Sequence, residues 1–188
     1  MSSEQESYRH RNRTGTGLVH IYCGDGKGKT TCGMGLCCRA AGAGLRVVIC
    51  QFMKDNSTSE RRILAGLDEV TWIPGKSEEK FSFQMTEEEK AERRVFYREQ
   101  LQGAFQTAAM LPAQVLFLDE VIYTVAAGLL DEQALLECLD ERPDDLEVIL
   151  TGQGPSPELL ARADYVTEMK KIRHPFDHKQ KARKGIER

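Results

Sequence analysis

The stretch Gly24-Asp-Gly-Lys-Gly-Lys-Thr-Thr31 decides the fold of this chain. It follows the run Gly17-Leu-Val-His-Ile-Tyr22, which predicts a short buried strand, and it opens onto a predicted helix from about residue 30 to residue 43. A glycine-rich loop between a strand and a helix directs backbone amides and the positive end of the helix dipole toward one point. This context favours a phosphate-binding loop over a glycine-rich turn that happens to contain lysine.

The residue types of this loop suit a bound nucleotide. Glycines let the backbone approach phosphate oxygens, Lys29 supplies a positive charge, and the Thr30 hydroxyl can coordinate magnesium. We expect ATP to contact the whole loop, namely Gly24, Asp25, Gly26, Lys27, Gly28, Lys29, Thr30 and Thr31. The usual spacing would place a glycine where this chain has Cys23. The loop is therefore one residue short, which changes how the nucleotide lies relative to the usual frame.

An acidic pair, Asp119-Glu120, ends the apolar run Val115-Leu-Phe-Leu118. It looks like the second magnesium-holding element of P-loop proteins. Acidic residues also end strands merely as solvated caps, and the phosphate loop is what favours the functional interpretation. In hydrolases the second acid orients water, so this pair leaves open whether ATP is hydrolysed or consumed in another way.

The rest of the chain alternates predicted strands and helices. Further strands are predicted at 46–52, 70–73 and 148–150, and helices begin at Thr86-Glu-Glu-Glu89 and Ser156-Pro157. Continuous apolar strands are typical of sheets that are buried on both faces. The sequence thus predicts an α/β fold of the P-loop NTPase type, with three layers and a mostly parallel central sheet flanked by helices.

Composition bounds the domain count, the compartment and the partners. The 188 residues fit a polar, mobile arm at 1–16 and a single domain at 17–188. A formal net charge of -3 gives no indication of nucleic-acid binding. The chain contains no apolar segment long enough for a membrane, and its cysteines lack the Cys-x-x-Cys pattern of zinc sites. A cytoplasmic protein with reduced thiols is expected.

Several further segments, taken with the loop, resemble the ATP:corrinoid adenosyltransferase family. They are Gln51-Phe-Met-Lys54, Leu118-Asp-Glu120, Glu141-Arg-Pro143, Thr151-Gly152, His174-Pro-Phe176 and Gly185-Ile-Glu187. The resemblance implies that cobalt(I) of a corrinoid attacks the 5′-carbon of ATP and releases triphosphate. It also implies cob(I)alamin or cob(I)yrinic acid a,c-diamide as substrate, in adenosylcobalamin synthesis or salvage.

The same resemblance implies roles for individual residues. ATP would lie reversed relative to other P-loop proteins, so that Lys29 and magnesium offset the charge of the leaving triphosphate. Thr30 and Glu120 would hold the magnesium ion. Family members place aromatic residues against the lower face of the corrinoid, where this chain has Phe81 and Phe83; ordinary packing under a loop is the alternative. The second of these family positions is often tryptophan.

Partners follow from the same family. It implies a homodimer, in which the arm carrying Arg9, Arg11 and Arg13 covers the partner's site, with simple disorder as the competing account. It also implies a flavoprotein reductant. For His174 we expect a structural role or a hydrogen bond near substrate, and the surrounding basic tail would lie close to the active region. A small-molecule kinase or ATPase, or a non-catalytic chaperone that binds ATP and corrinoid, would use the same loop and differ in products.

Overall fold

Six parallel strands form the central sheet, in the order β3-β2-β4-β5-β1-β6. The computed structural model describes residues 17–76 and 85–187. The strands are β1 (Val19–Cys23), β2 (Val47–Gln51), β3 (Val70–Ile73), β4 (Val115–Asp119), β5 (Glu147–Thr151) and β6 (Tyr165–Glu168). The predicted parallel sheet is confirmed, and it gains β6, which the sequence did not indicate.

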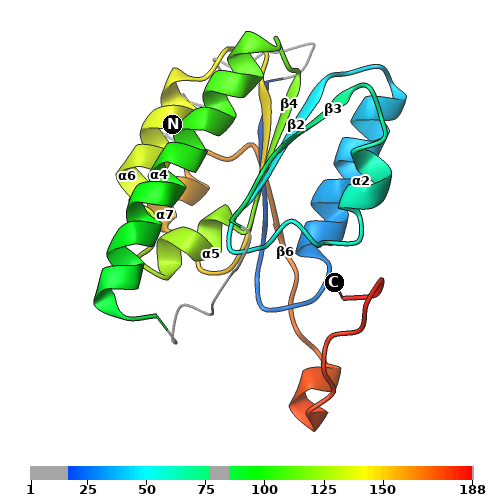
Figure 1. Cartoon of the computed structure of the whole chain (residues 1–188), viewed down its shortest axis with the longest axis vertical. Helices are drawn as coiled ribbons and strands as arrows, with labels where there is room; N and C mark the ends of the chain where they lie inside the picture. Colours follow the sequence, from blue (N-terminus) through cyan, green and yellow to red (C-terminus); the bar gives the residue numbers. More distant parts are fainter. Residues whose placement is uncertain (1–16, 77–84, 188) are drawn as a thin grey trace, which may run out of the picture.

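Helices cover both faces of this sheet (Figure 1). One face carries α2 (Lys29–Gly42) and α3 (Arg61–Leu64). The other carries α4 (Glu87–Met110), α5 (Val121–Ala126), α6 (Glu132–Glu141) and α7 (Pro157–Leu160). A 3-10 helix, η2 (Pro175–His178), lies in the C-terminal tail, which projects from the sheet (Figure 1). The predicted three-layer architecture is therefore confirmed.

Burial on both faces explains why the central strands are mostly apolar. All residues of β2 and of β4 are buried. Successive side chains of a strand point to opposite faces. Accordingly, Val48 and Cys50 join the core under α4, whereas Val47 and Ile49 join the core under α2. The same alternation in β4 divides Leu116 and Phe117 between the two cores, so the sheet is filled by packing on both sides.

Helix ends follow the predicted capping signals. Thr86 and Glu89 form a complete capping box at the start of α4. Ser156 accepts a hydrogen bond from the Leu159 amide at 3.0 Å and begins α7. The six cysteines are all free thiols. Within the described ranges, no helix combines the length and apolar character needed to cross a membrane.

Replacing two glycines of α2 by alanine should shift stability in opposite directions. A Cβ at Gly33 would lie 2.4 Å from the ring of Phe117, whereas a Cβ at Gly35 would meet nothing within 4 Å. Overpacking costs about 1–3 kcal/mol, and alanine for glycine in a helix gains roughly 0.5–1 kcal/mol. Thermal denaturation should therefore show a lower melting temperature for Gly33→Ala and a higher one for Gly35→Ala. Shifts of the same sign would contradict this packing of α2 on β4.

Candidate nucleotide-binding site

The register of the sheet gathers polar residues at its carboxyl edge. Gln51 of β2 is paired with Asp119 of β4, and Tyr22 of β1 is paired with Thr151 of β5. Because all strands are parallel, the segments that follow them leave the sheet on the same side. The phosphate loop after β1 therefore lies beside the acidic pair after β4, as the sequence predicted.

Close backbone contacts fix the shape of the phosphate loop. Gly24 and Gly28 have φ of 101° and 114°, which favour glycine. A Cβ on Gly24 would lie 2.5 Å from the carbonyl oxygen of Met169, and a Cβ on Gly26 would lie 2.6 Å from the same atom. The Gly26 amide donates to this oxygen at 2.6 Å. Glycine is thus required where the chain after β6 crosses the loop.

The C-terminal segment is tied to the loop by a side chain as well. The Lys171 amide donates to Asp25 Oδ1 at 2.8 Å. This bond is the main cause of the lowered pKa of Asp25, whose charged form it favours. The start of the basic tail therefore lies against the phosphate loop, as the family resemblance implied. Further along the tail, His174 Nδ1 accepts a hydrogen bond from the Phe176 amide at 3.1 Å and caps η2, which is a structural role.

Cationic and hydroxyl groups of the loop face the acidic pair. Lys29 is the first residue of α2, and its Nζ donates to the Gly26 carbonyl oxygen at 2.8 Å. Thr30 Oγ1 donates to Asp119 Oδ1 at 2.9 Å. Lys27 and Thr31 are exposed. The start of α2 therefore offers backbone amides and an ammonium group, which suit a phosphate chain. The Thr30 hydroxyl suits a hard cation.

Asp119 is the centre of this network. Its side chain has no exposed surface. Besides Thr30, the donors to its carboxylate are Thr151 Oγ1 at 2.7 Å, Gln51 Nε2 at 3.0 Å and Lys54 Nζ at 2.5 Å. Burial would raise the pKa of Asp119, but the charge of Lys54 and these hydrogen bonds outweigh burial and lower it. Asp119 is therefore ionised.

Glu120 has a different environment from its neighbour. Its backbone is left-handed, with φ of 61°, and it precedes α5. Burial raises the pKa of Glu120, the charge of Asp119 raises it further, and Lys54 and Lys29 act in the opposite direction. A strained backbone that carries a desolvated carboxyl group beside a phosphate loop is typical of functional sites. The structure brings Asp119 into contact with Thr30, and the metal-binding role of Glu120 stays a prediction.

Thr151 and Gly152 hold the acidic pair in place. The Glu120 amide donates to Thr151 Oγ1 at 2.8 Å, and the same hydroxyl donates to Asp119. A Cβ on Gly152 would lie 2.4 Å from the Tyr123 amide nitrogen, so glycine lets α5 pack against the end of β5. Sequence reasoning gave no role to Thr151, Gln51 or Lys54. Each is a polar residue at or just after the carboxyl end of a buried strand, which is the signal that could have identified them.

The structure does not describe the predicted aromatic residues or the N-terminal arm. Phe81 and Phe83 lie outside the described residues, as do Arg9, Arg11 and Arg13. The aromatic contact with the corrinoid and the role of the arm therefore stay predictions.

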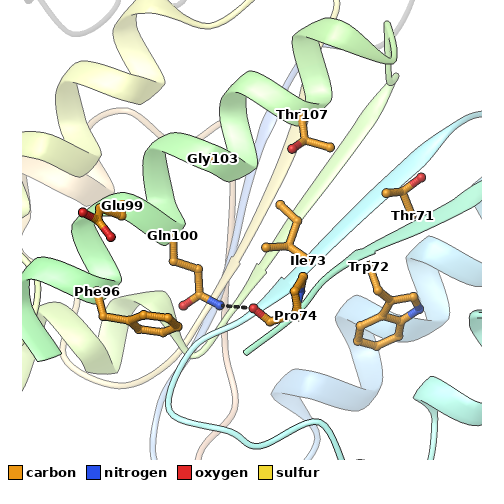
Figure 2. A pocket seen from close by; sticks show the side chains of 9 residues that line it. All are labelled: Thr71, Trp72, Ile73, Pro74, Phe96, Glu99, Gln100, Gly103 and Thr107. Atoms are coloured by element: carbon orange, nitrogen blue, oxygen red, sulfur yellow. Dashed lines mark hydrogen bonds between the residues drawn. The ribbon is translucent and has the colours of Figure 1, made fainter. Parts of the chain in front are cut away.

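A separate groove lies between β3 and α4, at the sheet edge opposite β6 (Figure 2). Its volume is about 390 Å³, and its lining includes Ile73, Phe96 and Gly103. Figure 2 shows the Gln100 amide directed to the Pro74 carbonyl oxygen, at 3.5 Å. Strands β2, β4 and β5 separate this groove from β1. The phosphate loop and the acidic pair therefore define the candidate site without it.

Comparison with known proteins supports a corrinoid-modifying enzyme. The model of the family described as ATP:corrinoid adenosyltransferase BtuR/CobO/CobP matches residues 15–188. The chain is 32% identical to the corrinoid adenosyltransferase of Escherichia coli K12 over 174 residues, which covers 91% of this chain and 85% of that protein. Corrinoid adenosyltransferase CobA of Salmonella typhimurium LT2 gives the same identity and coverage. The enzyme of Pseudomonas aeruginosa is 30% identical, over 91% of this chain and 83% of that protein.

A solved structure supports the fold alone. A KaiC-like protein from Pyrococcus horikoshii OT3 superposes with a TM-score of 0.51 and is 16% identical in sequence. The match covers 82% of this chain and 73% of that one. This likeness agrees with the P-loop NTPase-like architecture predicted from the phosphate loop.

Two adjacent substitutions should change stability in opposite directions. The pKa of Glu120 is raised above its unfolded value, so its ionisation opposes folding as pH rises through that range. Glu120→Gln should therefore raise the melting temperature at about pH 7.5, and the gain should vanish near about pH 4.

Substitution of the neighbouring Asp119 should have the opposite effect to Glu120→Gln. The pKa of Asp119 is lowered, so its charge stabilises the fold above the unfolded pKa, and this contribution is lost as pH falls below it. Asp119→Asn should lose roughly 1.5–3 kcal/mol at neutral pH because Lys54 loses a charged partner. Thermal and denaturant unfolding of both variants across pH measure these effects. A stabilised Asp119→Asn would contradict the network.

Proposed function

This chain belongs to the ATP:corrinoid adenosyltransferase family, and from that premise we propose which of its residues carry the reaction. It transfers the adenosyl group of ATP to a corrinoid. The observation that supports our assignment is the phosphate loop facing a buried, ionised Asp119 through the Thr30 hydroxyl. We take cob(I)alamin or cob(I)yrinic acid a,c-diamide as the substrate.

The phosphate loop, residues 24–31, holds the triphosphate of ATP in this proposal. Cobalt(I) attacks the 5′-carbon of ATP, the carbon–cobalt bond forms with the cobalt electron pair, and the bond from carbon to the triphosphate oxygen breaks. Triphosphate leaves with that bonding pair, and cobalt becomes formally cobalt(III). No proton has to be removed from the attacking atom. The protein therefore binds, orients and neutralises charge, and a general base is not required.

Lys29 is the residue that we assign to the leaving group. Its ammonium group donates to the Gly26 carbonyl oxygen, within the loop that would surround the phosphate chain. Thr30 and Glu120 would hold magnesium, and Asp119, which accepts a hydrogen bond from Thr30, would lie beside the ion as a second carboxylate. Oxygen donors of this kind fit a hard cation that shares its ligands with phosphates. When bound, magnesium would supply further positive charge to the triphosphate.

The assembly and its electron supply are further parts of the proposal. We propose a homodimer and a flavoprotein that reduces the corrinoid to cobalt(I), in the cytoplasm, with residues 17–188 as one catalytic domain and residues 1–16 as an arm. Phe81 and Phe83 would lie against the lower face of the corrinoid and favour loss of its axial ligand, which eases reduction. Gel filtration with light scattering tests the dimer directly.

The products distinguish the proposed reaction from its alternatives. Incubation of the protein with ATP, magnesium and chemically reduced cobalamin should yield triphosphate and adenosylated corrinoid in equal amounts. ADP or phosphate as the only products would indicate a kinase or ATPase, and tight binding without turnover would indicate a chaperone; either outcome overturns the proposal.

Lys29→Ala should lower kcat about 100- to 1,000-fold, because a group that stabilises transition-state charge is lost.

Substitution of the two phenylalanines should separate reduction of the corrinoid from transfer of the adenosyl group. Phe83→Ala and Phe81→Ala should slow the reaction that starts from oxidised cobalamin with the reductase present. They should leave the reaction of chemically reduced cobalamin close to that of the unsubstituted protein. Met110→Ala is the control, because Met110 ends α4 and is 82% exposed. Equal rates from oxidised cobalamin for the phenylalanine variants and this control would eliminate the aromatic role.

A further inference from the structure

Lys54 occupies an unexpected position at the phosphate loop. It follows the end of β2, and its Nζ lies 3.0 Å from Thr30 Oγ1 and 2.5 Å from Asp119 Oδ2. Its side chain is 23% exposed, whereas that of Asp119 is fully buried. One ammonium group therefore bridges the hydroxyl of the loop and the carboxylate that ends β4.

The Thr30 hydroxyl and the Asp119 carboxylate correspond to metal-binding groups of other proteins with this loop. The Ser or Thr of the loop and an Asp at the end of a neighbouring strand together hold the magnesium ion that accompanies the nucleotide. Here Thr30 Oγ1 donates directly to Asp119 Oδ1, and the Lys54 ammonium contacts Thr30 Oγ1 and Asp119 Oδ2, where that ion would lie. Two cations cannot share that space without strong repulsion, because both would lie within a few ångströms of the same carboxylate.

We propose that Lys54 is an exchangeable counter-ion of the nucleotide site. In the nucleotide-free protein its ammonium group neutralises Asp119 at the position of the metal. When magnesium and ATP bind together, the ammonium group leaves that position and contacts the triphosphate, beside Lys29. The inference rests on the proposed nucleotide site, but it does not depend on the transfer to a corrinoid.

Lys54 is the donor that can move. Gln51 and Thr151 also donate to Asp119, but they are buried and belong to β2 and β5, whose backbones are fixed by the sheet. Lys54 follows the strand, and its ammonium group is carried on a long, flexible stem. Its departure removes one positive charge from Asp119 at the moment when a divalent cation replaces it. The buried carboxylate is therefore neutralised in both states.

The movement would also assist the reaction. Triphosphate gains negative charge as its bond to the 5′-carbon breaks, and a second ammonium group beside it stabilises that charge. In the nucleotide-free state the same group keeps Asp119 from binding a metal ion alone. Lys54 thereby couples metal binding to nucleotide binding.

The test measures metal and nucleotide binding without corrinoid. Lys54→Met removes the charge and keeps much of the stem, and Lys54→Gln retains a donor for Asp119 if the first variant folds poorly. Without nucleotide, both should bind Mn²⁺, followed by electron paramagnetic resonance, about tenfold or more tightly than the unsubstituted protein, because a competing cation is gone. With magnesium present, both should bind ATP about tenfold more weakly by calorimetry, because a charge-assisted hydrogen bond is lost.

The test has a matched control, and the two affinities of the Lys54 variants, for Mn²⁺ and for ATP, should change in opposite directions. Lys90→Met removes a lysine that pairs with Glu87 on α4, and it should change neither affinity. If the Lys54 variants bind Mn²⁺ no more tightly than the unsubstituted protein, or bind ATP equally well, the exchange is disproved. A protein that shows both shifts but forms no adenosylated corrinoid would overturn the proposed function and leave the role of Lys54 intact.

Discussion

The buried negative charge of Asp119 is the constraint on which the site depends. An ionised carboxylate inside a sheet is stable only if its oxygens are hydrogen-bonded and its charge is paired. Here the partners come from the end of β2, the end of β5 and the start of α2, together with Lys54. These partners meet only in the observed strand order, in which β4 lies between β2 and β5. The chemistry of one side chain is thus tied to the register of the whole sheet.

The phosphate loop depends on a second distant segment. Its glycines are close to the carbonyl oxygen of Met169, and Asp25 accepts from the Lys171 amide. These contacts exist because β6 adds to the edge of the sheet beside β1 and carries the chain past the loop. The C-terminal tail therefore belongs to the nucleotide site by its backbone, although most of its side chains are exposed. A loop that is one residue short is held by neighbouring chain as well as by its own turns.

Sequence reasoning recovered what apolar continuity and capping can show. The strands β2 and β4 are apolar up to a polar last residue, and α4 begins at a capping box, so these elements were predictable. By contrast, β6 is exposed along its whole length, so the buried apolar pattern that identified the central strands is missing there. Glu120 adopts a left-handed backbone, a conformation that non-glycine residues rarely adopt, so its orientation was not predictable. Lys54 belongs to a segment that carries the family resemblance, but its contact with Asp119 appears only in the folded chain.

Charge at the site is balanced in a way that suits triphosphate but does not by itself choose the reaction. Lys29, Lys54 and a metal ion would stabilise a leaving triphosphate as well as a transferring phosphate. A KaiC-like protein shares the fold at 16% identity, and a fold by itself does not specify a chemistry. The reaction is decided by which end of the nucleotide meets the acceptor. In this chain the family match over residues 15–188 supplies that information, and in our proposal the polar network holds the other end.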